Sequence, residues 1–411
     1  MDLKTKRWIV LIVSCVVNVI IGTGYAWSVF ATPWARLLFG PEATGAQVAL
    51  VFGICNSVGP ITMIAGGKIN DALGPKWVVF VGGLMFGGGI FLAGFGQTEA
   101  MLYIGYSIIF GLAMGLIYSC TIGNTVKWFP DKRGLVGGLT TAAYGIGSVL
   151  LAFIISNTMT VDETNVAKVF MVLGVIYAVV VCVGAFFITP APAGYIPEGW
   201  TPPAPAAGMK APEDKTWNQM LADPIFYVMI LTLLAGAFFG LMMISNASPI
   251  AQKTVGFTPA TAGLVVTALA LCNTGGRVVC GWVSDLLGRI NTLAVALVLA
   301  VVGLFLVKYG AGNGIGSAFV IGVCIVGFTF GAFMGVYPGF TADQFGPKNN
   351  GINYGIMFIG FAVAGWFGPK IVSSYATAEP PYDMAFTIAI VIAIVGLALT
   401  FLYRAMSRKK A

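Results

Sequence analysis

The sequence predicts an all-α polytopic membrane protein, with twelve transmembrane helices arranged as two pseudo-symmetric bundles of six. The first observation is the composition, because 58% of the 411 residues are hydrophobic and only 9% are charged, with a mean hydropathy of +0.91. Soluble domains carry roughly 25% charged residues. The second observation is a series of long hydrophobic stretches, and the third is a sequence repeat that relates the two halves of the chain.

Each hydrophobic stretch is long enough to cross a hydrocarbon core of about 30 Å as a helix. The stretches cover residues 8–30, 46–70, 77–95, 100–127, 134–157, 165–189, 224–250, 258–284, 290–310, 315–345, 350–374 and 380–404. The first stretch is too long for a secretory signal and lacks its small-residue cleavage site, so we expect a retained helix.

A proline-rich segment of mixed charge follows the sixth stretch. It reads ITPAPAGYIPEGWTPPAPAAGMKAPEDKTW, a composition typical of a linker rather than of a membrane span. We therefore predict an N-terminal six-helix bundle over 1–189, a cytoplasmic linker over 190–223 and a C-terminal six-helix bundle over 224–411.

The two halves carry matching motifs in matching places. The matched pairs are GGKINDALGPKW at 66–77 with CGWVSDLLGRIN at 280–291, and the segment 115–138 with 331–355. The first pair aligns Asp71 with Asp285 and Gly74 with Gly288. A parallel six-helix repeat with a binding site near the membrane midplane is similar to the architecture of major facilitator transporters. The resemblance implies the major facilitator fold and transport by alternating access.

The basic residues predict the orientation. With a cytoplasmic N-terminus, sixteen of the 22 Lys and Arg residues fall on the inner side and five on the outer side, and Arg277 remains within a helix. This bias follows the positive-inside rule and predicts a multi-pass protein of the cytoplasmic (inner) membrane with both termini cytoplasmic. The excess of basic residues on the inner side of the lipid bilayer accounts for the net charge of +7, so no nucleic acid partner is expected. A topology miscounted by one pair of helices is the alternative.

The loop G-x-x-x-D-x-x-G-x-[RK] at 67–76 resembles the signature of the same superfamily. Its copy at 281–290 differs because Arg289 directly follows the glycine. An acid at a helix end can pair with neighbouring basic residues and hold a cytoplasmic gate. We therefore assign gating to Asp71, Asp285 and Arg289, which say nothing about the substrate.

Arg277 is the most informative residue for the substrate. It lies about 8 residues before the polar end of its helix at Ser284 and Asp285, which corresponds to a depth of roughly 12 Å. A buried arginine at this depth costs about 2.5 to 3.5 kcal/mol on insertion scales and is a functional hypothesis by default. Three alternatives are open: snorkelling to the surface, pairing with backbone carbonyls near Gly275 and Gly276, or a shifted helix boundary.

The predicted membrane interior offers no counter-charge to this arginine. All 15 acidic residues fall in loops or at helix ends, and the chain has no histidine, which removes the usual proton relay. An arginine without an internal anion indicates an anionic substrate, because the guanidinium fork suits a carboxylate.

Other polar residues are candidates for the same site. Asn273 lies one turn before Arg277 on the same helix face, where its amide can bind the substrate or steady the guanidinium. Tyr25, Asn56, Tyr118 and Tyr144 lie near the middles of helices one, two, four and five. Each of these residues alone is as compatible with helix packing, since interhelical hydrogen bonds are common in membranes.

Several chemistries are absent from the sequence. The seven cysteines fall inside helices without CxxC spacing, which indicates packing rather than a metal or disulfide, and the 55 glycines allow close helix contact. No phosphate-binding loop, nucleotide fingerprint or catalytic triad occurs. We therefore expect a protein that is not an enzyme, needs no cofactor or metal, acts as a monomer and takes its energy from a gradient.

Three segments are similar to bacterial oxalate/formate antiporters, and the first also resembles animal monocarboxylate transporters. They are WFPDKRGLVGGLTTAAYGIG at 128–147, NTGGRVVCGWVSDLLGR at 273–289 and GTGYAWSVFATP at 22–33. In the antiporter an Arg in helix eight and a Lys in helix eleven face the two carboxylates of oxalate. Arg277 matches the first cation, and NYGIMFIGFAVAG at 353–365 places Phe361 at the second.

The resemblance implies further site residues by position. Tyr25, Tyr118 and Tyr144 match tyrosines of the antiporter's binding cage, Asn56 stands where it has Gln, and Phe330 and Phe358 stand where it has Trp. A dicarboxylate here would leave one carboxylate unpartnered in an apolar pocket, at a cost of several kcal/mol. The pattern therefore favours a substrate with one carboxylate.

Animal monocarboxylate transporters, which move lactate and pyruvate with a proton, carry an Asp where this chain has Asn273 and a Lys near Ser28 or Val29. Both proposed proton-handling groups are replaced here. We predict a secondary active transporter of small monocarboxylates of lactate or pyruvate size that works by proton symport. The alternatives are an anion exchanger of the oxalate/formate type and, from another class, a non-transporting membrane receptor or an intramembrane enzyme.

Overall fold

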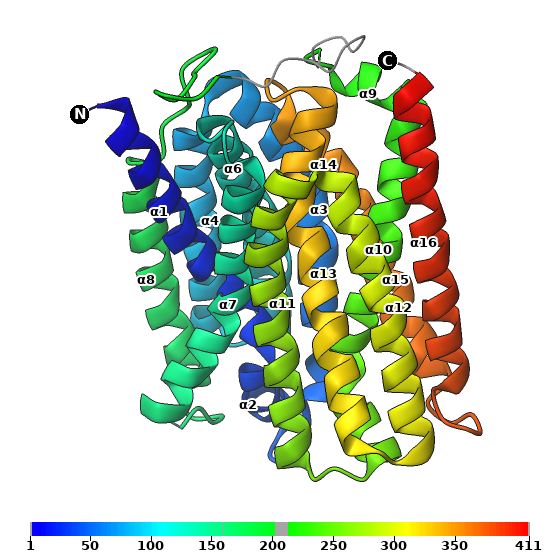
Figure 1. Cartoon of the computed structure of the whole chain (residues 1–411). Coiled ribbons are helices and arrows are strands. Elements are labelled where there is room, and N and C mark those ends of the chain that lie inside the picture. Colours follow the sequence, from blue (N-terminus) through cyan, green and yellow to red (C-terminus); the bar gives the residue numbers. More distant parts are fainter. Residues whose placement is uncertain (1, 159, 202–212, 410–411) are drawn as a thin grey trace. The chain divides into compact units, whose positions relative to one another are not determined.

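The computed structural model describes residues 2–158, 160–201 and 213–409, and within these ranges every regular element is helical (Figure 1). Twelve helical spans in this part of the chain are long and apolar enough to cross a membrane. The predicted all-α fold with twelve spans is therefore confirmed. The first span runs from Leu3 to Phe39, so it is longer at both ends than the predicted stretch 8–30.

Short segments of 3₁₀ or π geometry lie between the α-helices of the N-terminal half. In chain order, the elements are α1 (Leu3–Gly22), the 3₁₀ turn η1 (Thr23–Ala26), α2 (Trp27–Phe39), the 3₁₀ turn η2 (Gly45–Val48), α3 (Ala49–Leu73), α4 (Pro75–Gly96), α5 (Glu99–Leu102), the π-helical segment η3 (Tyr103–Phe110), α6 (Gly111–Trp128), α7 (Arg133–Thr158) and α8 (Val166–Ala185). The first of these short segments, η1, carries Tyr25. Such mid-helix changes of geometry often mark functional positions.

The C-terminal half follows the same plan. Its helices are α9 (Trp217–Leu221), α10 (Pro224–Ile250), the π-helical segment η4 (Ala251–Val255), α11 (Pro259–Leu287), α12 (Arg289–Asn313), α13 (Gly316–Phe345), α14 (Asn350–Met357), α15 (Ile359–Ser374) and α16 (Asp383–Lys409).

Local sequence explains where several of these helices begin and end. Asp223 caps α10 by accepting a hydrogen bond from the Ile225 amide, and Pro224 occupies the first helical position, where its missing N–H costs nothing. At the other end of a helix, glycine adopts a positive φ that other residues avoid. Gly74 ends α3 with a φ of 83° and Gly288 ends α11 with a φ of 84°. The two aligned glycines of the sequence repeat thus adopt the same backbone conformation.

The chain divides into two compact units, and each unit includes a short segment from the other half of the sequence. Unit 1 contains Met1–Pro130, Ala143–Trp200 and Pro347–Ile356, and unit 2 contains Asp131–Ala142, Thr201–Gly346 and Met357–Ala411. The first turns of α7 therefore pack with unit 2, and most of α14 packs with unit 1. The division into bundles over 1–189 and 224–411 stays a prediction, and residues 202–212 of the predicted linker lie outside the described ranges.

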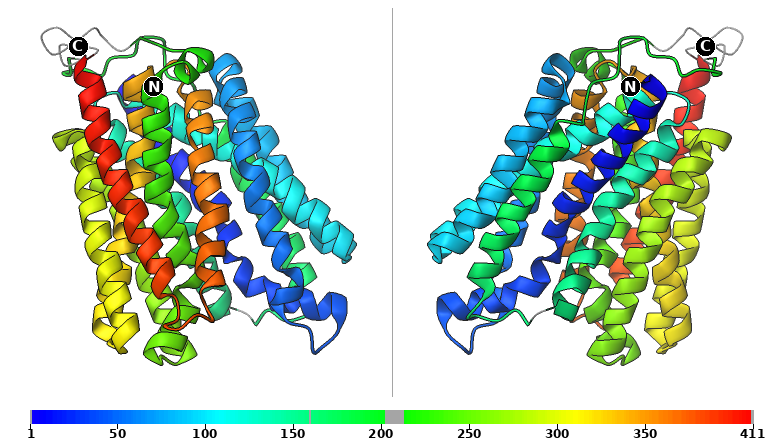
Figure 2. Two further views of the ribbon diagram at one scale, coloured as in Figure 1. Left: turned by 90° about the vertical axis from the view of Figure 1, so that its right-hand side faces the viewer. Right: turned by 90° about the vertical axis from the view of Figure 1, so that its left-hand side faces the viewer.

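Within each unit, small residues bring helices close together. In unit 1, α4 packs along α8, and α3 along α6. A Cβ added at Gly87 would overlap the Gly174 carbonyl oxygen, so these two glycines set the approach of α4 to α8, as expected for membrane helices. In unit 2, α13 packs between α11 and α12, and α16 runs beside α12 (Figure 2).

Candidate functional site

Arg277 lies inside a continuous helix in unit 2. It stands ten residues before the end of α11 at Leu287, so the alternative of a shifted helix boundary is wrong. The residue is only 7% exposed. Its Nε donates to the Asn273 Oδ1 at 3.1 Å, and its Nη1 donates to the Thr141 carbonyl oxygen of α7 at 2.6 Å. These partners fix the plane of the guanidinium but leave its positive charge uncompensated.

No carboxylate among the described residues forms an ion pair with Arg277. The alternative of pairing with a backbone carbonyl is realised in part, although the acceptor belongs to α7 rather than to a break beside Gly275 and Gly276. Asn273 steadies the guanidinium, which was one of the two roles expected of it. Thr141 was not predicted, because a carbonyl acceptor leaves no signal in side-chain identity.

Glycines hold the backbone around Arg277 in place. A Cβ at Gly331 of α13 would overlap the Asn273 carbonyl oxygen. A Cβ at Gly335 would overlap the Arg277 carbonyl oxygen. Gly276 and Gly138 make equally close approaches, to the Phe328 and Arg277 carbonyl groups. The small-xxx-small spacing of Gly331 and Gly335 is the sequence signal that could have found this support.

Three phenylalanines predicted to line the site form one stack in unit 2. The Phe358 and Phe361 ring centroids lie 4.4 Å apart with an interplanar angle of 22°, and those of Phe330 and Phe361 lie 6.4 Å apart at 23°. Phe330 and Phe358 are buried. The position expected for a second cation is therefore the middle ring of an apolar stack.

The tyrosines predicted for the binding cage lie together in unit 1. Tyr144 contacts Tyr118 with ring centroids 4.8 Å apart and Tyr25 with centroids 5.4 Å apart and an interplanar angle of 83°. Its hydroxyl donates to the Met114 sulfur at 3.1 Å. Tyr25 is 37% exposed, whereas Tyr118 and Tyr144 are buried.

Asn56 of α3 is linked to the tyrosines through Phe52, which lies one helical turn before it. Its Nδ2 donates to the Phe52 carbonyl oxygen at 2.9 Å, and the Phe52 ring packs edge-to-face against Tyr25 at 6.0 Å. A hydrogen bond to the preceding turn is a common way to satisfy a polar side chain in a membrane helix. The tyrosines and Asn56 thus form one polar and aromatic cluster, while the role of each in binding stays a prediction.

Asp71 and Asp285, the two aligned acids for which gating was predicted, make the same kind of contact, each within its own unit. In unit 1, Asp71 lies 2.6 Å from the Lys127 Nζ and accepts a hydrogen bond from the Ile352 amide at 3.1 Å. In unit 2, Asp285 accepts from the Gly134 amide at 2.9 Å and also from the next amide, that of Leu135. Both carboxylates therefore sit at a helix N-terminus, α14 for one and α7 for the other, where the helix dipole favours negative charge.

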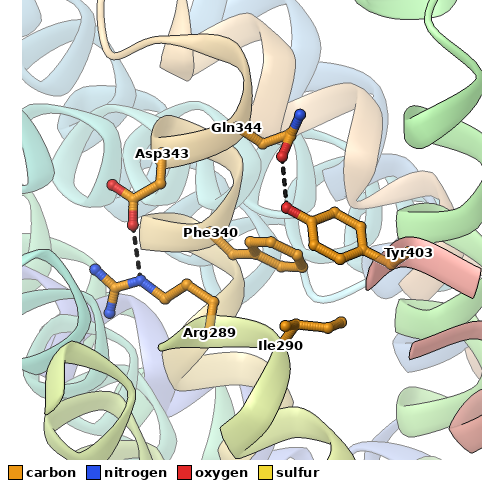
Figure 3. A pocket seen from close by; sticks show the side chains of 6 residues that line it. All are labelled: Arg289, Ile290, Phe340, Asp343, Gln344 and Tyr403. Atoms are coloured by element: carbon orange, nitrogen blue, oxygen red, sulfur yellow. Dashed lines mark hydrogen bonds and ion pairs between the residues drawn. The ribbon is translucent and has the colours of Figure 1, made fainter. Parts of the chain in front are cut away.

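In unit 2, Asp285 is also part of a series of ion pairs. Arg289 lies 2.6 Å from the Asp285 Oδ1 and 2.8 Å from the Asp343 Oδ2 (Figure 3). Asp343 also pairs with Arg133 at 2.6 Å. In unit 2 the motif acid pairs with Arg289 of the same motif, whereas in unit 1 it pairs with Lys127, which lies outside the loop motif at 67–76. Lys127, Arg133 and Asp343 were not singled out from the sequence, because lone charges at helix ends occur throughout the chain.

The second pair of matched segments, 115–138 and 331–355, supplies equivalent glycine contacts near Asp71 and Asp285. Gly67 approaches Gly351 in unit 1, and Gly281 approaches Gly134 in unit 2, so that a Cβ on any of the four would overlap a neighbouring group. Each pair joins the helix that carries the motif acid to the helix that the acid caps. The repeat predicted from the two motif pairs therefore specifies equivalent packing as well as equivalent residues.

A family model described as Major Facilitator Superfamily matches residues 7–369 and 233–411 of this chain. The chain belongs to the Major Facilitator Superfamily. It is accordingly a multi-pass membrane transporter, and its relatives are transporters rather than enzymes. The predicted family is confirmed.

Two curated relatives carry the resemblance further. The oxalate:formate antiporter of Oxalobacter formigenes is 30% identical over 413 residues, which cover 98% of this chain and 93% of that protein. Monocarboxylate transporter 9 of Gallus gallus is 29% identical over 146 residues, which cover 35% of this chain and 28% of the relative. Both families named from the sequence motifs are therefore found among its relatives.

A solved structure confirms the fold. The crystal structure of FucP, a transporter of the same superfamily in the outward conformation, superposes with a TM-score of 0.72 at 13% identity and covers 97% of this chain and 99% of its own. At this identity the likeness concerns the arrangement of the helices alone.

Proposed function

We propose that this transporter carries small monocarboxylates of lactate or pyruvate size and couples them to protons. The single observation that carries the proposal is Arg277, a buried guanidinium whose protein partners are neutral. A carboxylate supplies the missing charge and accepts the remaining N–H donors, and charge-assisted hydrogen bonds of this kind are about twice as strong as neutral ones. Asn273 and Thr141 hold the guanidinium ready, so that little reorganisation accompanies binding.

The stack of Phe330, Phe358 and Phe361 favours one carboxylate over two. A second carboxylate against these rings would lose its hydration without gaining a partner, which costs several kcal/mol. A methyl group, or a carbon carrying one hydroxyl, loses little there. For the tyrosine cluster and Asn56 of unit 1, we propose polar and aromatic contacts in substrate binding.

Neutralisation of Arg277 provides the coupling between binding and movement. A lone cation at the depth of a membrane span is costly, and the cost falls when a monoanion pairs with it. The substrate therefore stabilises the conformations through which the carrier must pass, which is the condition for a ligand-dependent shift of population. Transfer of a monoanion together with one proton moves no net charge across the membrane.

The gating groups act on the same cycle. Asp71 holds the start of α14 within unit 1, and Asp285 holds the start of α7 within unit 2. We propose that these contacts break and form as the transporter alternates between its states. The protein acts as a monomer in the cytoplasmic membrane with both termini cytoplasmic, in accord with the distribution of its basic residues.

A second candidate is exchange of anions. The antiporter of Oxalobacter formigenes aligns with almost the whole chain, and a single Arg277 can bind one anion at a time from either side. Under exchange, uptake requires an anion preloaded inside the vesicle. Under symport, an inward proton gradient alone is sufficient.

Uptake of labelled L-lactate into proteoliposomes tests the proposal. We expect Arg277→Ala to abolish saturable uptake and Arg277→Lys to weaken it strongly, because an ammonium group cannot reproduce the fork of a guanidinium. Arg36→Ala, which removes an exposed arginine at the end of α2, is the matched control. Full uptake by Arg277→Ala would refute the assignment of the site.

The same vesicles separate the two candidates. Uptake is measured with an inward proton gradient and empty vesicles, and then without the gradient in vesicles preloaded with lactate, formate or oxalate. Symport predicts accumulation in the first case. Uptake confined to preloaded vesicles would replace symport by exchange and leave the role of Arg277 intact.

A further inference from the structure

An apolar groove runs along unit 2 between α12 and α16, outside the residues assigned to transport. Its volume is about 330 Å³, and it is lined by Asn291, Ala294, Val295, Val298, Leu299, Leu397, Phe401 and Arg404. Val295 and Phe401 are each 56% exposed, so the groove is open along its side. Ala294, in contrast, is buried.

One end of the groove is polar. The Arg404 Nη2 donates to the Asn291 Oδ1 at 2.7 Å, and its guanidinium carbon lies 5.4 Å from the Phe401 ring centroid. The Arg404 Nε is buried, and none of the described residues accepts a hydrogen bond from it. Nor does any described carboxylate form an ion pair with Arg404.

The neighbouring cavity shows the contrast. Arg289, one residue before Ile290 at the start of α12, faces Asp343, and the Tyr403 hydroxyl bonds to Gln344 (Figure 3). There the cation is compensated by the protein itself. Among the described residues, Arg404, which follows Tyr403 along α16, has a neutral amide as its hydrogen-bond partner. A buried donor on a cation without an anion is a costly arrangement unless a ligand completes it.

We propose that this groove binds an anionic phospholipid, with the phosphate group on Arg404 and Asn291 and one acyl chain along the groove. A long apolar channel that is open to the side and ends in a single cation matches the shape and charge of such a lipid. Basic pockets between transmembrane helices on the cytoplasmic side are typical sites for anionic head groups.

The position along the helices agrees with this occupant. Arg404 and Asn291 lie at the ends of α16 and α12 that face the cytoplasm in the orientation proposed above, on which this inference rests. The cytoplasmic leaflet carries the anionic lipids. The sequence continues past Arg404 with three more basic residues, Arg408, Lys409 and Lys410, and clusters of basic residues on the cytoplasmic side are typical of segments that attract anionic lipids.

Native mass spectrometry of the full-length protein in detergent tests the proposal. The ligands are phosphatidylglycerol, phosphatidylcholine with the same acyl chains, and free glycerol 3-phosphate. We expect phosphatidylglycerol to bind about five-fold more tightly than phosphatidylcholine, since one surface cation contributes on the order of a five-fold preference for an anionic lipid. Glycerol 3-phosphate alone should not bind, because it lacks the chain that occupies the groove.

Two variants separate the head group from the chain. Arg404→Gln should bring phosphatidylglycerol down to the affinity of phosphatidylcholine, and Val298→Trp, which fills the groove, should weaken both lipids. Lys4→Gln, which removes an exposed cation at the start of α1, is the control and should change neither. An unchanged preference in Arg404→Gln, or tight binding of glycerol 3-phosphate, would overturn the proposal. Thermal unfolding in lipid-free detergent checks that each variant is folded.

Discussion

Gly276→Ala tests whether the packing of α11 against α13 positions Arg277. A Cβ at Gly276 would overlap the Phe328 carbonyl oxygen, whereas a Cβ at the adjacent Gly275 meets nothing within 4 Å. Both changes gain about 1 kcal/mol of helix propensity, so they differ only in the steric contact. To relieve the overlap, the two helices must separate locally by about 1 Å, and overpacking of this kind costs about 1 to 3 kcal/mol.

The same displacement acts on the site, because Arg277 directly follows Gly276. Its Nη1 lies 2.6 Å from the Thr141 carbonyl oxygen, and a shift of about 1 Å takes that pair beyond good hydrogen-bond geometry. Loss of one hydrogen bond to a charged group corresponds to roughly 1.5 kcal/mol or more. We therefore expect the KM for lactate to rise by about tenfold in Gly276→Ala and by less than about twofold in Gly275→Ala.

The assay is the initial rate of L-lactate uptake into proteoliposomes over a range of lactate concentrations. Size-exclusion profiles and thermal midpoints of both purified variants control for folding. Equal KM values for two folded variants would refute the claim that glycine packing sets the position of the guanidinium. A loss of maximal rate at unchanged KM would instead place the effect on helix movement.

Three further substitutions probe charge at single positions. Phe361→Lys should increase the preference for oxalate over lactate by at least about tenfold in competition uptake, since a charge-assisted hydrogen bond contributes about 1.5 to 3 kcal/mol. An unchanged preference would show that Phe361 does not contact the substrate. Asn273→Asp places a carboxylate at the Arg277 Nε, so lactate should bind several-fold more weakly while the acid is ionised. The affinity for lactate should recover as the pH falls and the acid protonates, and a pH-independent KM would contradict this. Asp285→Asn removes the charge paired with Arg289 but keeps one acceptor oxygen, so the maximal rate should change with the KM unaltered, and a change in KM alone would argue against a gating role.

The fold was predictable because each part of it depends on local composition. Hydrophobic length alone locates twelve spans, and Gly74 and Gly288 terminate equivalent helices through a conformation that glycine adopts most easily. The family follows from motifs that are contiguous in the sequence. What the sequence did not show is that the first turns of α7 and most of α14 pack with the other half, because that exchange depends on tertiary contacts of backbone amides.

The candidate site was predictable in its side chains and not in its backbone. Arg277 is conspicuous because a charge in an apolar stretch is costly, and Asn273 follows from helical spacing. The Thr141 carbonyl and the close approach of Gly331 leave no comparable trace, since every residue has a carbonyl and glycine is common in this chain. Phe361 could be located only by resemblance to a family in which another residue stands at that position.

The partners of the cation differ between the predicted binding site and the predicted gate. Arg289 is held by two carboxylates, so its charge is compensated by groups that stay with the protein. Arg277 is held by an amide and a carbonyl, which orient it without cancelling its charge. A neutral partner leaves this charge available to the proposed monocarboxylate, whereas an ionised carboxylate at the same place would compete with that substrate. Under the proposed function, Asn273 therefore orients the guanidinium and leaves its charge to the substrate.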